Sequence, residues 1–195
     1  MAAGAGCESA DAGAVVAVTL EPFLAHHVPL LSDWLLRPHV APWYPRPADD
    51  LARATEPPPG AAHALIAVDA VAVGYLRWQH VDRETLDSIG LCEIPDNSVD
   101  IDILIGEVGQ LARGVGPVVL DLLAQRLLQD ATVPVLGLTS SVANARAHRA
   151  FAKAGFHIER QYDPNGLGPC HLLLRDLRPE RARGLSYKVP STRPG

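Results

Sequence analysis

The sequence predicts an α/β (α+β) domain in which helices flank a mixed, largely antiparallel central sheet. Apolar or alternating runs follow one another at 63–69, 71–81 and 99–106 with turns between them, which is typical of antiparallel strands. After residue 113, stretches with helical spacing alternate with further strand-like runs. A chain of 195 residues is long enough for one sizeable core and short for two. We therefore expect one domain over 15–176.

The first quarter of the chain predicts a strand and a helix. Residues 1–14 are mostly small, so we expect a disordered leader there. The apolar run Val15 to Pro22 predicts a strand. Apolar residues at helical spacing over 28–35 predict a short amphipathic helix that ends before Pro38. A proline-rich loop over 38–60 follows, and a short helix within it is one interpretation.

The rest of the chain completes the sheet and its cover. Turns are expected at Asp69-Ala70 and over 82–97, between the three runs named above. The spacing over 114–130 predicts a helix of about four turns. The remaining expected elements are a buried strand at 133–140, a helix at 144–155 closed by Gly155, two strands at 156–162 and 168–176 around an Asn165-Gly166 turn, and a tail over 177–195.

Composition excludes several classes of protein. The formal net charge is −5 and no run of Lys or Arg resembles a nucleic-acid-binding surface, so we expect a cationic partner and no nucleic acid. Three scattered cysteines are too few for a disulfide framework or a zinc site, and we expect no metal. Neither a secretory signal nor an apolar stretch of membrane-spanning length is present, so we expect a cytoplasmic protein without a membrane partner.

The segment "QLARGVG", residues 110–116, stands between a strand-like run and a helix-like stretch. Gly114 and Gly116 remove Cβ atoms at a helix start, where backbone N–H groups lack intrahelical partners and an anion can approach closely. The helix dipole and Arg113 would reinforce such a site. The pattern indicates a phosphate cradle, with a structural turn that binds nothing as the alternative. It matches neither a Walker loop nor a dinucleotide fingerprint.

The order of elements around this corner carries a resemblance. A strand, a Gly-x-Gly corner, a helix, a strand and an Asn-x-x-Ala helix ending in "KAGF" resemble the GNAT superfamily of N-acetyltransferases over residues 15–176. Within it, "DIDILIGEVGQLARGVG" is similar to the aminoglycoside 6′-N-acetyltransferases. These enzymes have an aspartate in this strand, then an "IGE"-like turn and a "Q-L-x-[KR]-G-[LI]-G" corner. The resemblance implies a GNAT fold with a splayed acyl-CoA cleft. It also implies acetyl transfer from acetyl-CoA to the 6′-amine of aminoglycosides, an antibiotic-resistance activity.

The resemblance also implies where acetyl-CoA binds. The corner's backbone N–H groups would hold the pyrophosphate, and the strand before it would pair with the pantetheine arm as an added strand. Asn144 would meet the pantetheine or thioester end, although it is equally a candidate N-cap. The expected cofactor-binding residues are Ile103, Leu104, Ile105, Gln110, Leu111, Ala112, Arg113, Gly114, Val115, Gly116, Asn144 and Lys153.

Acetyl transfer to an amine requires a base, because a typical alkylamine is protonated at pH 7. Asp100 and Asp102 lie two apart in a predicted strand and face one side of it, although aspartate is depleted in strands. A solvated sheet face is the alternative interpretation. Asp102 falls on the aspartate of the aminoglycoside-type pattern, and we expect it to be the base. Strand N–H groups left open by a splayed neighbour would stabilise the oxyanion.

The departing thiolate raises a second question about catalysis. Where the family commonly has a tyrosine shortly before "K-A-G-F", this chain has Phe151, which puts a tyrosine general acid in doubt. His148, one turn earlier, is a candidate replacement. A solvated surface histidine and departure of an unprotonated thiolate are the alternatives.

The substrate side departs from the family pattern as well. Thr139 and Ser140 stand where these enzymes usually have an acidic residue followed by proline, so one carboxylate for a polycationic sugar is missing. Trp43 and Tyr44 match a substrate-facing aromatic pair, whereas packing in the proline-rich loop is an equal alternative for Trp43. The turn before residue 98 would add carboxylates to an acidic mouth. The expected substrate-binding residues are Trp43, Tyr44, Trp78, Glu93, Asp96, Asp100 and Asp102.

Two other functions stay open at this point. An N-acyltransferase for hydroxylysine-type siderophore precursors shares this architecture, but there we expect a histidine at the position of Asp102. A binding module that kept the acyl-CoA fold and lost turnover would hold an acyl-CoA or a drug. The substrate is expected to be a cationic amine, and the protein a monomer or a homodimer.

Overall fold

The computed structural model describes residues 17–166 and 168–178 of the chain. Within these residues, seven strands form one sheet in the order β1-β2-β3-β4-β5-β7-β6, and every neighbouring pair except β4 and β5 is antiparallel. The strands are β1 Val18–Pro22, β2 Ala61–Val68, β3 Val71–Val81, β4 Ser98–Ile105, β5 Val135–Ser141, β6 His157–Tyr162 and β7 Cys170–Asp176. The α-helices are α1 Val28–Leu35, α2 Pro47–Thr55, α3 Arg83–Ser88, α4 Val115–Leu127 and α5 Ala145–Lys153. The mixed, largely antiparallel sheet flanked by helices confirms the expected fold class.

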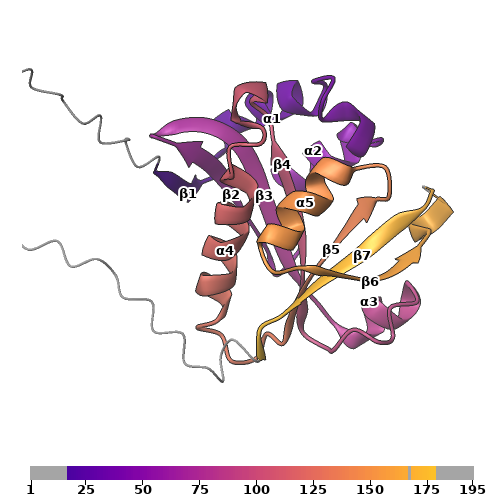
Figure 1. Ribbon diagram of the computed structural model, residues 1–195. Coiled ribbons are helices and arrows are strands. Elements are labelled where there is room, and N and C mark those ends of the chain that lie inside the picture. The colour runs from indigo at the N-terminus through magenta and orange to yellow at the C-terminus, as the bar shows by residue number, and fades with distance from the viewer. Residues whose placement is uncertain (1–16, 167, 179–195) are drawn as a thin grey trace, which may run out of the picture.

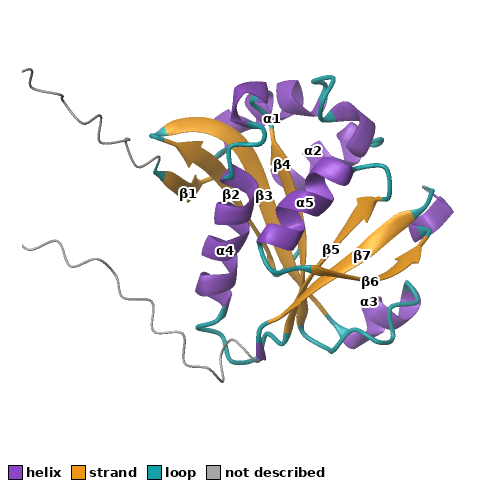
Figure 2. Cartoon of the chain, in the orientation of Figure 1, coloured by secondary structure: helices purple, strands orange, loops and turns teal. Residues whose placement is uncertain are grey.

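The helices form two layers, one on each face of the sheet (Figures 1 and 2). α4 and α5 cover one face, and the main core there includes Leu120 and Leu123 of α4 against Leu76 and Leu136 of the sheet. On the other face α1 and α2 pack over β2 to β4, and α3 lies beside β5 and β7. No helix among the described residues has the length and apolar content needed to cross a membrane.

The predicted meander is confirmed in its strands and in its direction. β2 and β3 are antiparallel through the turn at Asp69 and Ala70, whose φ angles are 49° and 64°. β3 and β4 are antiparallel with Arg77 opposite Asp102. The helix expected from the spacing over 28–35 is present as α1, and it ends before Pro38 as expected.

The turn over 82–97 was expected to lack regular structure and contains a helix, and the short helix that was one interpretation of the loop over 38–60 is present. The turn expected over 82–97 begins with α3, which Asp82 caps by accepting a hydrogen bond from the Thr85 N–H at 2.8 Å. α3 has six residues and buries only Leu86, too few positions to show a helical period in sequence. The proline-rich loop over 38–60 holds a 3₁₀ turn, η2 at Ala41–Trp43, and then α2, which begins at Pro47.

The ends of the expected domain are only partly described. Residues 1–16, which include the expected leader and the first two positions of the predicted strand, lie outside the described residues. Residues 179–195, most of the expected tail, also lie outside them. Leu177, where the tail was expected to begin, is fully buried in the main core, and its N–H donates to the Pro134 carbonyl at 2.9 Å.

The sheet opens between β4 and β5. These parallel strands pair only at Val99 with Leu136 and at Asp100 with Gly137, and beyond those pairs they diverge (Figure 1). β5 continues along β7, whereas β4 continues along β3, so the half of β4 after Asp100 has no neighbour on its β5 side. This opening is the splayed cleft that the resemblance implied.

Candidate functional site

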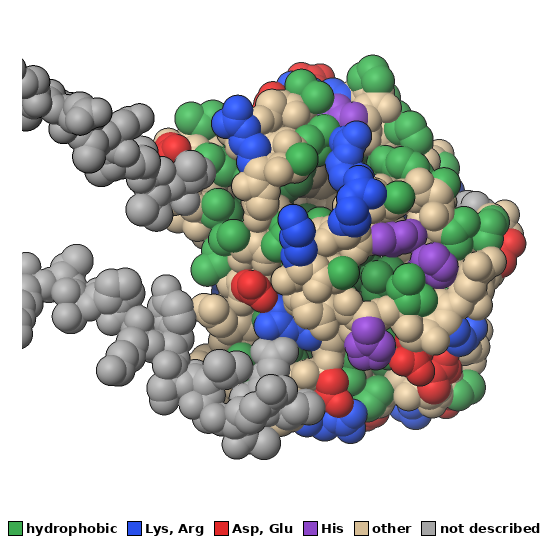
Figure 3. Space-filling model, in the orientation of Figure 1, with side chains coloured by type: hydrophobic (Ala, Val, Ile, Leu, Met, Phe, Trp, Pro, Cys, Tyr) green, Lys and Arg blue, Asp and Glu red, His purple; other side chains and the backbone are tan. Residues whose placement is uncertain are grey.

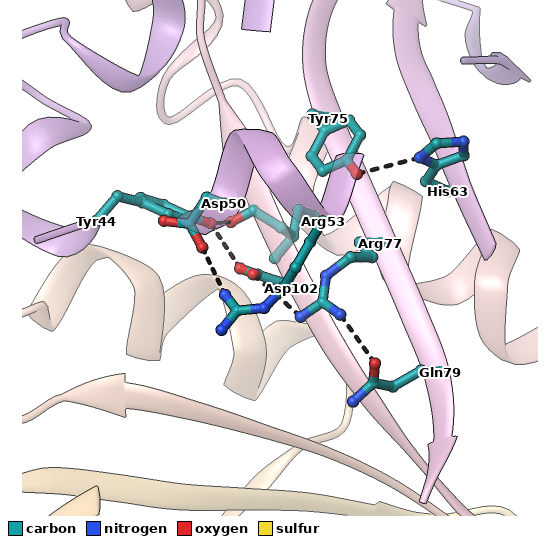
Figure 4. A network of polar contacts seen from close by, with 9 residues as sticks. Tyr44, Asp50, Arg53, His63, Tyr75, Arg77, Gln79 and Asp102 are labelled. Atoms are coloured by element: carbon teal, nitrogen blue, oxygen red, sulfur yellow. Dashed lines mark hydrogen bonds and ion pairs between the residues drawn. The ribbon is translucent and has the colours of Figure 1, made fainter. Parts of the chain in front are cut away.

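Asp102 lies on β4 beside the opening, on the face covered by α1 and α2. Side chains alternate along the strand, so Asp102 and Leu104 face this layer while Ile101 points into the main core. Arg77, directly opposite on β3, places Nη2 3.6 Å from Asp102 Oδ2, and the Asp102 side chain is 32% exposed. Arg77 itself is buried, and its Nη1 donates to Gln79 Oε1 at 2.9 Å. The guanidinium therefore contacts one carboxylate oxygen, Oδ2, and leaves Oδ1 for another partner (Figure 4).

The Tyr44 hydroxyl contacts the other carboxylate oxygen, Asp102 Oδ1. Tyr44 follows η2, and its hydroxyl lies 2.8 Å from Asp102 Oδ1 and 3.0 Å from the Ile103 carbonyl oxygen (Figure 4). Burial raises the pKa of Tyr44 well above its usual value, and the negative charge of Asp102 raises the pKa further. The phenol is therefore neutral and serves as a hydrogen-bond donor to the edge of β4.

A third charged layer comes from α2. Asp50 shares a pocket with Tyr44, Arg77 and Asp102, and its nearest cation is Arg53, with Nη1 3.1 Å from Asp50 Oδ1. Burial raises the pKa of Asp50, and the charge of Asp102 adds to that shift. Sequence reasoning missed Asp50 because two adjacent carboxylates in the first turn of a short helix are ordinary there. Sequence reasoning gave no role to Arg77, although a charge inside an apolar strand was a usable signal.

Asp100 lies one pleat before Asp102, at the base of the opening. It is half-buried and pairs in register with Gly137 of β5. Burial, reinforced by the charge of Asp102, raises the pKa of Asp100 to about 6. Across the opening, the Thr139 hydroxyl lies 2.6 Å from the Tyr162 hydroxyl, so a neutral pair stands where the family usually supplies a carboxylate.

The expected acidic mouth is only partly present. Glu93 forms an ion pair with Arg160 of β6, whose hydrogen bond holds the pKa of Glu93 below its usual value. Asp96 is exposed on the loop before β4. Glu93 therefore adds no net negative charge beside Asp100, because its charge is balanced by the guanidinium.

The two tryptophans of the expected substrate set lie away from Asp102. Trp43 is 38% exposed in η2 and is not among the side chains that line the Asp102 pocket. Trp78 points to the opposite face of β3, where it is buried in the main core with Arg126 stacked 5.4 Å from its ring centroid. Its place in the core differs from the substrate-facing position that we expected.

The glycine corner has the backbone geometry of an anion site. A 3₁₀ turn, η3 at Val108–Gln110, leads to Ala112 with φ 61° and to Gly114 with φ 84°, which is the N-cap of α4. Among the described residues, the N–H groups of 112–116 have no hydrogen-bond acceptor. A Cβ on Gly116 would lie 3.8 Å from Ala150 Cβ, so α5 packs directly on the start of α4.

Basic side chains surround this corner. Lys and Arg gather on the face that α4 and α5 form (Figure 3). The exposed basic residues of the corner and of α5 are Arg113, Arg146, Arg149 and Lys153. Five free N–H groups at a helix start, together with these cations, suit a diphosphate. Leu111 donates its N–H to the Val108 carbonyl at 3.2 Å and so belongs to the turn.

α5 presents three residues whose roles were left open. Asn144 is its N-cap and accepts a hydrogen bond from the Ala147 N–H at 3.2 Å, which confirms the capping interpretation. The His148 ring lies against His171 of β7 with centroids 4.9 Å apart, and burial lowers the pKa of His148. His148 Nε2 is buried without a partner within residues 17–166 and 168–178. Phe151 is buried in the main core.

Side chains that could bind a metal ion are not grouped together in the described residues. No group of three or more His, Cys, Asp or Glu side chains among the described residues is arranged to hold an ion.

Comparisons with known proteins agree with this geometry. The family model of the GNAT acetyltransferase domain matches residues 24–164. An aminoglycoside N(6′)-acetyltransferase type 1 of Klebsiella pneumoniae is 29% identical over 153 residues, which cover 74% of this chain and 75% of the relative. The same figures hold for the enzyme of that name from Serratia marcescens.

Solved structures of aminoglycoside acetyltransferases share the fold. The structure of AAC(6′)-Ib with coenzyme A and kanamycin has a TM-score of 0.72 and 25% identity, and the match covers 86% of this chain and 98% of that one. The aminoglycoside N(6′)-acetyltransferase of Legionella pneumophila has a TM-score of 0.67 at 16% identity, covering 89% and 99% of the two chains. With a family model that spans most of the described residues, the chain belongs to the GNAT acetyltransferase family.

Proposed function

We propose that this protein transfers the acetyl group of acetyl-CoA directly to a primary amine of a cationic small molecule, with Asp102 as the base. The 6′-amine of an aminoglycoside is the substrate that we favour. The observation that carries the proposal is the position of Asp102. Its carboxylate is oriented by Arg77 and lies beside the strand edge where β4 loses its neighbour.

The edge of β4 is suited to the pantetheine arm. The backbone of Ile103 and Ile105 faces away from β3, since their carbonyls contact the Tyr44 hydroxyl and His39 Nε2 instead. Strand alternation turns their N–H groups toward the opening as well. An arm with amide groups could add there as a strand, with its diphosphate at the corner beyond β4. The thioester would then lie level with Ile103 and Asp102.

The chemistry follows from this placement. An alkylammonium must lose a proton before its nitrogen can attack the thioester carbon. Asp102 would accept that proton directly or through water, and an N–H at the open edge would stabilise the oxyanion. Asn144, as the N-cap of α5, lies at a helix start and would keep its amide N–H₂ group for the pantetheine arm.

Support for an aminoglycoside comes from the relatives and from three carboxylates. The Klebsiella and Serratia relatives are named for this activity, and a related structure contains kanamycin. Asp100 and Asp102 lie on one face of β4 beside the opening, and Asp50 of α2 lines the same pocket as Asp102. Burial of Asp50 and Asp100 favours ligands that carry positive charge. Asp50 would replace the carboxylate that is missing at Thr139.

Release of CoA thiol from acetyl-CoA tests the proposal. We expect purified protein to acetylate kanamycin and tobramycin. It should not acetylate paromomycin, because the 6′ position of that aminoglycoside carries a hydroxyl, which is a weaker nucleophile than an amine. N-hydroxylysine and spermidine complete the panel. Turnover confined to N-hydroxylysine would replace the aminoglycoside with a siderophore precursor. Binding of acetyl-CoA without thiol release on any amine would leave a binding module.

A further inference from the structure

The leaving thiolate has no evident proton donor on α5. Phe151 carries no proton to give and is buried in the main core. His148 lies on the α4 and α5 side of the sheet and contacts His171, whereas Asp102 faces the layer of α1 and α2. A donor near the thioester therefore has to come from another element.

Tyr44 brings a hydroxyl to the required place. It contacts the carboxylate of Asp102 and the carbonyl of Ile103, which belongs to the open edge of β4. Arg77 lies at the opposite oxygen, Oδ2, so the phenol and the guanidinium do not compete for the same atom. No other tyrosine lining this pocket contacts Asp102, because the Tyr75 hydroxyl lies 3.3 Å from His63 Nδ1 (Figure 4).

We propose that Tyr44 is a further catalytic residue, which gives the departing sulfur a proton and takes in exchange the one that Asp102 removes from the amine. The proposal rests on the acetyl transfer proposed above. It replaces His148 as the source of the proton.

The protons and electrons balance within the site. An alkylammonium loses two protons on acetylation, and Asp102 accepts the first, directly or through water, and releases it to solvent before attack. The neutral nitrogen then forms the C–N bond, and the C–S bond breaks with its electron pair on sulfur. The second N–H proton passes to Asp102 Oδ1, from there to the Tyr44 oxygen, while the Tyr44 proton passes to sulfur. Asp102 and Tyr44 end in their starting states.

The environment favours such a relay over a phenolate intermediate. Tyr44 is kept neutral by burial beside a carboxylate, so its proton leaves only as another arrives from Asp102. Both transfers would occur together, which gives the relay a kinetic signature that a purely structural tyrosine lacks.

Single-turnover kinetics with kanamycin on the full chain test the proposal. Tyr44→Phe removes the relay hydroxyl, and Tyr75→Phe removes a matched hydroxyl that contacts His63 instead. We expect Tyr44→Phe to slow acetyl transfer by about a hundredfold, in the range typical of general acid–base groups. Its affinity for acetyl-CoA by calorimetry and its Tm should stay close to wild type, and Tyr75→Phe should stay within about twofold in rate.

The solvent isotope effect supplies the second readout. Wild-type protein in mixtures of H₂O and D₂O should give a curved proton inventory from two moving protons, and Tyr44→Phe a linear one. A Tyr44→Phe rate of acetyl transfer within twofold of wild type overturns the relay. A rate above wild type also overturns it, and would show that the phenol only occupies the place of the amine. A loss in His148→Asn with Tyr44→Phe unaffected overturns it in favour of the imidazole. If the wild-type protein acetylates no amine, the proposed function fails first and the relay with it.

Discussion

Asp102 is a carboxylate whose two oxygens have different partners. Oδ2 faces the buried Arg77 and Oδ1 accepts from Tyr44. A base in such a setting is held in one orientation, because rotation would break both contacts at once. The nearby carboxyls of Asp50 and Asp100 are the groups whose pKa values this charge raises. The proposed base therefore has a fixed orientation, and the ionisation of Asp50 and Asp100 depends on its charge.

Asp102→Asn keeps the shape of the side chain and removes its basicity. We expect kcat to fall by about a hundredfold or more, because general bases typically contribute that much, while the Kd of acetyl-CoA changes little. Steady-state kinetics and calorimetry measure the two effects. Equal losses in kcat and in acetyl-CoA affinity would contradict the role as base.

Asp100 makes the stability of the protein depend on pH. Its pKa is raised from 3.8 to about 6, so the folded state binds the proton more tightly than the unfolded chain. The free energy of unfolding therefore falls as the pH rises from 3.8 to about 6. Above that range, the charged Asp100 lowers the free energy of unfolding by at most about 3 kcal/mol. Asp100→Asn removes the penalty and should raise Tm above wild type at pH 8, with a smaller gain at pH 4.5.

A matched control separates this effect from a general change of charge. Asp33 is exposed on α1, and Asp33→Asn should give the same small change in Tm at both pH values. Thermal denaturation at the two pH values measures both variants. A gain for Asp100→Asn that does not grow with pH would show that Asp100 ionises normally.

At the scale of elements, the corner between β4 and α4 combines two functions in one motif. Gly106, at the end of β4, leaves room for the ring of Trp34, since a Cβ there would overlap ring atoms of Trp34. Glu107 then accepts from Trp34 Nε1 at 2.9 Å and pairs with Arg37. The "IGE" part of the motif thus ties α1 to the sheet, and the "ARGVG" part that follows presents the free N–H groups.

Gly114 is the position at which the corner is most open to test. Its φ of 84° disfavours a side chain, and a Cβ there would meet nothing within 4 Å. Gly114→Ala should therefore cost only about 1–2 kcal/mol in stability. The methyl group would stand among the N–H groups, and we expect the Kd of coenzyme A to rise at least about tenfold as they lose contact with phosphate.

Ala112 provides the opposite change in the same corner. It already has φ 61° without being glycine, so Ala112→Gly relieves local strain and should leave coenzyme A affinity unchanged. Calorimetry and denaturant unfolding of the two variants separate strain from ligand contact. Unaltered affinity in Gly114→Ala would mean that the corner is only a turn.

Local patterns predicted most elements well. The alternation of β3 and β4 and the helical spacing of α1 are properties of short windows, and all three were placed correctly. α3 escaped because one buried residue in six shows no period. The prediction that Asn144 caps a helix is confirmed, since an N-cap depends only on the three residues that follow.

At the scale of the whole molecule, the opening between β4 and β5 divides the sheet into two parts, which the main core joins on one face and the cluster beside α3 joins on the other. α4 and α5 cover both parts through the main core, while the opposite face has two separate clusters, one under α1 and α2 and the other beside α3. A ligand that fills the opening would add contacts across this division. Binding should therefore stabilise the whole fold.

Acetyl-CoA at a hundred times its Kd adds about 2.7 kcal/mol to the free energy of unfolding. For a chain of this size each kcal/mol raises Tm by roughly 2–4 °C, so we expect a shift of roughly 5–10 °C. Pantetheine at the same concentration lacks the diphosphate and should shift Tm much less. Equal shifts for both ligands would place the binding energy away from the corner.

By itself, the sequence determined the strands of the meander, the glycine corner and the fact that Asp100 and Asp102 share one side of β4. All of these follow from periods and backbone preferences within a few residues. Only the tertiary structure decided the partners of that carboxylate and the burial of Trp78. It also decided that Glu93 is neutralised by Arg160, 67 positions away. Tyr44 and Asp102 are 58 positions apart, and they meet because the loop after α1 folds over the sheet. Contacts between layers depend on how whole elements pack, which no local pattern encodes.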